Sequence, residues 1–110
     1  MKDKKNAQAL DMLDQVIVLK PEFAEGWNRR ATLYFNMKEY GKSIADIEQT
    51  LTLEPRHFGA LAGLGMILQQ TSNEKKALEA WYKVLEIFPA NKQAQEAVIR
   101  LEEKLTDRRT

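Results

Sequence analysis

Three prolines recur at a constant spacing of 34 residues along this chain of 110 residues, at Pro21, Pro55 and Pro89. Each follows an apolar run, and these runs read VIVLK, TLTLE and VLEIF. A constant period of this length indicates a repeated supersecondary unit. Because one such unit cannot bury its apolar face alone, we expect neighbouring units to stack and to share a core.

The central unit, residues 24–57, contains two amphipathic helical patterns. Apolar residues return at i, i+4, i+7 and i+8 in the first pattern, and at nearly the same spacing in the second. The positions are Trp27, Ala31, Tyr34 and Phe35, and then Ile44, Ile47, Leu51 and Leu53. A polar link within residues 36–41 has the length expected between antiparallel helices. The unit is therefore predicted to be a pair of antiparallel helices.

Residues of this pair fall on the pattern of a known repeat. In the central copy they are Trp27, Arg30, Ala31, Tyr34, Ser43, Ile47 and Pro55. In the following copy they are Leu61, Leu64, Gly65, Leu68, Ala77, Trp81 and Pro89. The unit resembles the tetratricopeptide repeat (TPR), a helix-turn-helix of 34 residues with small, aromatic and proline residues at set positions. The stretches GWNRRATLYF and EPRHFGALAGLG are similar to TPR proteins of proteobacteria.

The resemblance implies an all-α fold, a TPR α-α solenoid in which antiparallel helix pairs form a right-handed superhelix. Residues 1–110 are expected to form a single TPR domain with five or six helices and no strand. Residues 1–23 match only the second half of a repeat, through Ala9, Leu13 and Pro21, so a truncated repeat is expected there. Two full repeats at 24–57 and 58–91 follow, and residues 92–110 provide a capping helix and tail.

The patterns also predict the limits of individual helices. We expect helices over residues 7–19, 24–37, 43–53, 58–70, 74–87 and 92–105, after a charged lead-in at residues 1–6. The links between them are expected near residues 20–23, 38–41, 54–57, 71–73 and 89–91. Ser72 or Asn73 is expected to cap one helix, and Asn91 is expected to open the last.

Composition argues against several functions. The chain has no cysteine and one histidine, so neither thiolate catalysis nor a metal site is expected, and no cofactor is implied. A formal net charge of +1 disfavours a nucleic-acid partner. No apolar run approaches the ~20 residues needed to cross a bilayer, so no membrane insertion is expected. We expect a soluble non-enzyme, cytoplasmic, or exported if a signal peptide has been removed.

The resemblance implies a concave groove that holds a segment of a partner protein. The groove positions are Asn28, Arg29, Thr32, Phe35, Ala62, Gly63, Met66 and Gln69. TPR domains that clamp the terminal carboxylate of heat-shock chaperones use lysine, asparagine and arginine there, and only Asn28 and Arg29 are similar in type. An apolar or mixed partner segment is therefore expected. Gly59 and Gly63 either accommodate a neighbouring helix or let a ligand approach closely.

Self-association is the alternative function. The expected truncation leaves an apolar stripe on the first helix without its usual cover, and this stripe predicts a homodimer. Its residues are Leu10, Leu13, Val16 and Ile17. That the next helix covers the stripe sufficiently is equally compatible with the sequence.

Several single residues carry further expectations. Arg30 stands where the family usually has leucine, so its stem is expected to pack while its head reaches a carboxylate or the surface; an anion contact shared with Arg29 is the alternative. Tyr34 and Trp81 are expected in the core, and His57 at the surface or in a cap. The small residues expected to allow close helix approach are Ser43, Ala45 and Gly65.

Overall fold

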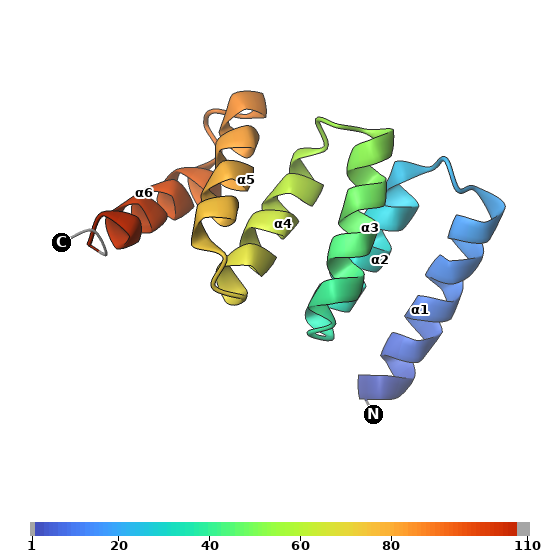
Figure 1. Cartoon of the computed structure of the whole chain (residues 1–110). Helices are drawn as coiled ribbons and strands as arrows, with labels where there is room; N and C mark the ends of the chain where they lie inside the picture. Colours follow the sequence, from blue (N-terminus) through green and yellow to red (C-terminus); the bar gives the residue numbers. More distant parts are fainter. Residues whose placement is uncertain (1, 108–110) are drawn as a thin grey trace. The chain divides into compact units, whose positions relative to one another are not determined.

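The computed structural model describes residues 2–107 of the chain, and it contains six α-helices and no strand within that range (Figure 1). The helices are α1 (Lys2–Leu19), α2 (Ala24–Asn36), α3 (Tyr40–Leu53), α4 (Phe58–Gln70), α5 (Glu74–Ile87) and α6 (Lys92–Asp107). The predicted all-helical fold is confirmed.

The helices group into two compact units, divided between His57 and Phe58. In the first unit α2 packs against α3 and α1 packs against α2. In the second unit α4 packs against α5, and α5 packs against α6. The division falls at the boundary that the proline spacing predicts between its two complete units.

The turn inside each helix pair has the same backbone construction. Lys38 and Ser72, which stand 34 residues apart, are the described non-glycine residues with positive φ, at 62° each. Two backbone bonds close each turn in the pattern of a Schellman motif. They are Glu39 N–H to Tyr34 O (2.8 Å), Lys38 N–H to Phe35 O (2.9 Å), Asn73 N–H to Leu68 O (2.8 Å) and Ser72 N–H to Gln69 O (3.2 Å). The repeat is therefore preserved in the backbone where the two side chains differ.

This motif explains why the predicted limits of two helices were wrong. The first link was expected to extend to Gly41, but α3 already begins at Tyr40 because the left-handed residue Lys38 completes the reversal. The predicted lead-in is wrong too, since α1 is helical from Lys2. Lysine is a good helix former, so a charged sequence continues the helix instead of ending it.

Only one of the predicted helix caps has the expected side-chain bond. Asn91 Oδ1 accepts a hydrogen bond from the backbone N–H of Ala94 at 2.8 Å, which caps α6 as expected. Asn73 precedes α5 but makes no side-chain cap bond; its amide donates to Thr71 instead. At the other end of α6 the helix continues to Asp107, and the predicted tail at 108–110 lies outside the described residues.

Small and apolar residues hold α2 against α3 in the first unit. Ala31 and Ile47 are buried, and the buried Ser43 hydroxyl donates to the carbonyl of Ala31 at 2.6 Å. Ser43 thus allows the close approach that was predicted. Ala45 does not, because it is exposed on the far side of α3. Tyr34 is half-buried, so its predicted full burial in the core is wrong.

Trp81 and Gly65 form the closest contact of the second unit. Trp81 is 1% exposed, as predicted for a core residue, and its indole lies directly over Gly65. A Cβ atom added at Gly65 would come within 2.7 Å of two indole ring atoms. The indole N–H donates to Gln69 Oε1 at 2.8 Å. The predicted need for a small residue at position 65 is therefore explained by Trp81.

Two glycine-to-alanine substitutions should change stability in opposite directions. Gly41→Ala places its Cβ where no atom lies within 4 Å, so the gain in helix propensity should stabilise the fold by up to about 1 kcal/mol. Gly65→Ala gains the same propensity but overlaps the Trp81 indole, and overpacking should destabilise the fold by about 1 to 3 kcal/mol. Urea denaturation of both variants measures the difference. Equal midpoints would show that the indole does not restrict position 65.

Candidate partner-binding surface

The predicted partner-binding residues occupy equivalent arcs on two helices, one in each unit. With about 100° of rotation per residue, positions 28, 29, 32 and 35 of α2 correspond to positions 62, 63, 66 and 69 of α4. Arg29 and Thr32 are exposed, and the other six residues are half-buried. No member of either arc is fully buried.

The α4 arc is continuous and uncharged. Phe58, Gly59, Ala62, Gly63, Met66 and Gln69 all fall within about 140° of the helix circumference. All are exposed or half-buried, whereas the buried residues Ala60, Leu61, Gly65 and Ile67 lie outside that arc. From Phe58 to Gln70 the helix contains no charged residue. The second unit therefore presents a shallow, mainly apolar helix face, whose small side chains allow close approach of another chain.

Polar groups of these arcs already have partners within the chain. Gln69 Oε1 accepts the Trp81 indole N–H, which holds the Gln69 side chain in place. Met66 Sδ lies 3.6 Å from Nε2 of Gln93 at the start of α6. On α2 the Thr32 hydroxyl donates to the carbonyl of Asn28 at 3.1 Å. The side chains of both arcs are thus partly preorganised.

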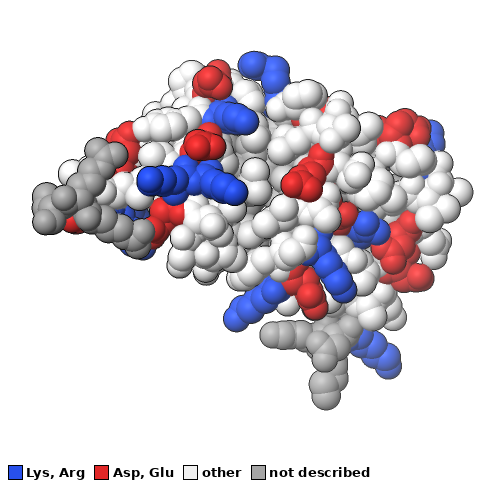
Figure 2. Space-filling model, in the orientation of Figure 1, with Lys and Arg blue, Asp and Glu red and all other residues white. Residues whose placement is uncertain are grey.

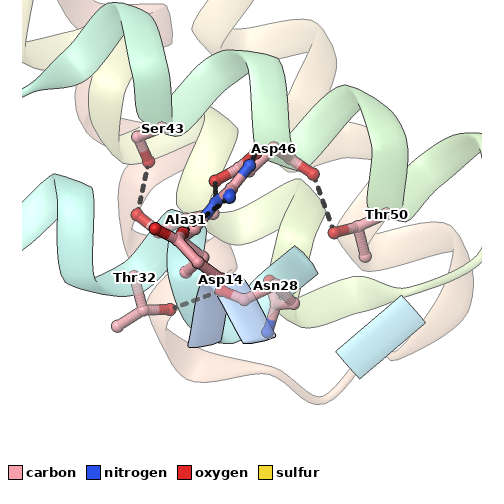
Figure 3. Close-up of polar contacts among 8 residues, drawn as sticks. Asp14, Asn28, Ala31, Thr32, Ser43, Asp46 and Thr50 are labelled. Carbon is pink, nitrogen blue, oxygen red and sulfur yellow. Dashed lines mark hydrogen bonds and ion pairs between the residues drawn. The ribbon is translucent and has the colours of Figure 1, made fainter. Parts of the chain in front are cut away.

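Arg30 is the centre of a polar cluster that joins all three helices of the first unit (Figure 3). Its Nε and Nη2 atoms donate to the two carboxylate oxygens of Asp46 on α3, at 2.8 and 2.9 Å. Its Nη1 atom donates to Asp14 on α1 at 2.9 Å. The Asp46 side chain is 4% exposed and that of Arg30 is 19% exposed, so the bidentate pair is largely removed from water. These contacts agree with the expectation of a packed, carboxylate-paired arginine.

Aromatic rings complete the surroundings of Arg30. The guanidinium carbon lies 5.3 Å from the centre of the Trp27 ring and 5.7 Å from that of Tyr34, both within the range of cation–π attraction. The hydrogen bonds to Asp46 raise the pKa of Arg30 above its usual value, against the opposing effect of burial. The residue is therefore held as a cation whose donors are directed at carboxylates of its own chain.

Glu25 links two further predicted residues. Its Oε2 atom lies 3.5 Å from Nε of Arg29, and its Oε1 atom lies 3.1 Å from Nε2 of His57. The His57 side chain is only 16% exposed, so the expectation of a surface residue is wrong. The reason is that the link after Pro55 returns the chain against the first turn of α2, where Glu25 lies.

The stripe predicted for self-association is turned mainly toward α2. Leu10, Leu13 and Val16 are half-buried, and Ile17 is buried at 8% exposure. Ile17 therefore cannot belong to an exposed stripe. The cause is Gly26 on α2, which has no side chain and lets the branched residues of α1 approach closely; a Cβ at position 26 would lie 3.1 Å from Val16.

Three other apolar residues of α1 face solvent and were missed by the sequence analysis. Met12 is 68% exposed, and Val18 and Leu19 are each 79% exposed. The repeat spacing contained the signal for Met12, because the positions 34 and 68 residues later, Asp46 and Ala80, are both buried. A position that is buried in two helix pairs is thus exposed on α1.

Polar side chains also join the helices of the second unit. The Tyr82 hydroxyl on α5 donates to Glu102 on α6, and this bond raises the pKa of Tyr82. Lys104 Nζ lies 2.7 Å from Oε2 of the buried Glu74 at the start of α5. The adjacent open depression of about 710 Å³ includes Lys75, Lys76 and Glu79 in its lining, which are charged and exposed. It is a solvated hollow without convergent catalytic groups.

Searches for two other kinds of site gave negative results. Within residues 2–107 no group of three or more histidine, aspartate or glutamate side chains is placed to hold a metal ion. None of the described helices is long and apolar enough to cross a membrane.

Comparison with known proteins agrees with the repeat architecture. A family model for the tetratricopeptide repeat matches residues 24–57. A TPR repeat-containing protein of Rhizobium etli is 53% identical over all 110 residues, which span 54% of that relative. The small glutamine-rich tetratricopeptide repeat-containing protein 2 of Saccharomyces cerevisiae is 30% identical over 100 residues, or 91% of this chain and 28% of the yeast protein. The chain therefore spans about half or less of these relatives.

Solved structures share the fold at low sequence identity. The first TPR domain of Spaghetti (RPAP3), bound to the HSP90 peptide SRMEEVD, has a TM-score of 0.88 at 21% identity, over 96% of this chain and 83% of that one. MamA has a TM-score of 0.86 at 22% identity, over 92% of this chain and 59% of that one. Together with the family model and the Rhizobium relative, these similarities establish that the chain is a tetratricopeptide-repeat protein of the proteobacterial type.

Proposed function

We propose that this chain is a non-catalytic protein-interaction module, which binds a segment of a partner protein on the arcs of α2 and α4. The observation that carries the proposal is the α4 arc, which is apolar, uncharged and open although the opposite side of the same helix is buried. Shallow apolar helix faces with a few fixed polar groups suit protein segments better than small molecules. No nucleic-acid partner is proposed, since 17 basic residues are balanced by 16 acidic ones.

Solved relatives of this fold support the proposal. The first TPR domain of Spaghetti is bound to an HSP90 peptide, and the second TPR domain of human RPAP3 is in complex with an HSP70 peptide. The predicted residues of this chain are Asn28, Arg29, Thr32 and Phe35 on α2, and Ala62, Gly63, Met66 and Gln69 on α4. Equivalent register on two helices is the arrangement that a repeat protein needs to hold one extended or helical segment at successive points.

Filling the α4 arc should abolish binding. Gly63→Leu adds a branched side chain at the centre of the arc, and we expect it to reduce capture of the partners that the unmodified chain recovers from cell lysate by at least about tenfold. Lys83→Leu, which adds comparable bulk at an exposed position of α5, is the matched control. Quantitative mass spectrometry of the captured proteins, with circular dichroism to verify folding, measures the effect. Equal capture by a folded Gly63→Leu variant would place binding elsewhere.

Self-association through α1 is a second candidate, favoured by the exposure of Met12, Val18 and Leu19. Burying each such side chain is worth roughly 1.5 to 3 kcal/mol, so two copies of the 110-residue chain are expected to form a homodimer. Met12→Lys combined with Val18→Glu should shift the dimer toward monomer without disturbing the α1 residues that face α2. Sedimentation velocity decides, and a monomer at high concentration before any substitution would refute this candidate.

A further inference from the structure

We infer that the segment bound by this chain is apolar and poor in aspartate and glutamate, so that acidic peptides are not its partners. The inference rests on the proposed function and specifies the chemistry of the partner. It is drawn from the charges near the α2 arc and from the composition of the α4 arc, each within its own unit.

Charges around α2 cancel within the first unit. The contacts described above bring together three cations and three carboxylates, so the formal charge of the cluster is zero. They are Arg29, Arg30, Lys42, Asp14, Glu25 and Asp46. An acidic segment approaching α2 would meet cations that already face carboxylates, and it would have to compete with those carboxylates for them. The face drawn in Figure 2 likewise shows acidic and basic side chains interspersed over the surface.

Arg30 in particular is not available to a ligand carboxylate. Three of its nitrogen atoms already donate to Asp46 and Asp14, and the bidentate geometry with Asp46 is the strongest that a guanidinium makes. Removing Arg30 from Asp46 would leave a carboxylate with 4% exposure unpaired, which is strongly unfavourable. Of the two arginines on α2, only Arg29 is directed toward solvent, with a side chain that is 69% exposed.

The α4 arc has complementary chemistry for apolar side chains. It contains no charge, and its glycine and alanine residues leave the helix backbone accessible to a close contact. Met66 provides a flexible, polarisable side chain that adapts to different apolar shapes. At the start of the arc Phe58 is 45% exposed and makes an edge-on contact with Phe88, which is also 45% exposed, at 5.9 Å between ring centroids. An aspartate or glutamate placed here would lose water without gaining a cation.

Selection from a phage-displayed library of random peptides tests the inference on the full 110-residue chain. Peptides are retained if they bind the unmodified chain and are rejected by Gly63→Leu. We expect them to be enriched in leucine, isoleucine, phenylalanine and methionine, and to contain aspartate and glutamate at less than about half of their frequency in the library. Their affinity should change less than about twofold between roughly 50 and 500 mM salt, because no charged contact is screened.

The acidic peptide SRMEEVD, found with the Spaghetti domain, is the direct counter-probe. Fluorescence anisotropy should show at least about tenfold weaker binding of SRMEEVD than of the selected peptides. Met66→Lys should reverse this order by adding a cation to the α4 arc, and Phe58→Ser, at an exposed position, should weaken the selected peptides in case Met66→Lys fails to fold.

The outcomes separate the inference from the function on which it rests. Enrichment of acidic peptides, or tighter binding of SRMEEVD, would overturn the inference while leaving segment binding intact. Selected peptides that bind Gly63→Leu equally well, or no enrichment at all, would overturn the proposed function together with the inference.

Discussion

Replacing Trp81 by alanine is expected to lower the free energy of unfolding by about 3 to 5 kcal/mol, which is a large part of the stability of a domain of this size. The indole is 1% exposed, lies against Gly65 and donates its N–H to Gln69. Its removal would create a cavity between α4 and α5 and would remove the bond that fixes a residue of the α4 arc. Urea denaturation monitored by circular dichroism measures the loss.

Tyr82→Ala is the matched control for this substitution. It removes an aromatic side chain from the next position of the same helix, but Tyr82 is 43% exposed and its hydroxyl contacts the exposed Glu102. Its effect should remain within about 1 kcal/mol, as is usual for surface substitutions. Similar midpoints for Trp81→Ala and Tyr82→Ala would contradict the assignment of Trp81 to the core.

Breaking the Arg30–Asp46 pair should have the second large effect. Asp46→Ala removes two hydrogen bonds from a guanidinium that is 19% exposed, and leaving a partly buried charge with Asp14 alone should cost about 3 kcal/mol. Asp14→Ala should cost less than about 1 kcal/mol, because Asp14 is 49% exposed and Asp46 still holds Arg30. Chemical denaturation of both variants provides the comparison.

A double substitution separates the loss of the pair from the exposure of an unpaired charge. Arg30→Leu combined with Asp46→Ala removes both charges and introduces the residue that the repeat pattern usually has at position 30. This double variant should be more stable than Asp46→Ala alone, because replacing a buried ion pair by apolar groups is often nearly neutral. A double variant that is less stable than Asp46→Ala would show that Arg30 stabilises the unit through its aromatic neighbours instead.

The helix order was predictable because it depends on local patterns. The 34-residue period fixed the register of α2 to α5, and the spacing of apolar residues identified the side of each helix that is buried. The errors at Gly41 and Lys2 concern helix ends, which depend on single backbone conformations. Lys38 takes the left-handed conformation without being a glycine, so its sequence carried no signal for the end of the turn.

The partners of Arg30 could not be predicted for a different reason. Asp14 and Asp46 each lie 16 residues from Arg30, on two other helices, so the contact depends on how α1 and α3 rotate about α2. The sequence indicated only that a guanidinium at a usually apolar position needs a carboxylate or water. The same dependence on helix rotation explains why Ile17 was expected on an open face although Gly26 lets α2 cover it.

Site-specific photo-crosslinking tests most directly whether the α2 and α4 arcs bind the partner. A photoreactive amino acid is placed at Thr32 or Met66 in the arcs, and at the exposed positions Glu48 of α3 or Lys83 of α5 as controls. After irradiation with the captured partner, we predict crosslinked product from positions 32 and 66 and little from positions 48 and 83. Crosslinking from positions 48 and 83 alone would contradict binding on the two arcs.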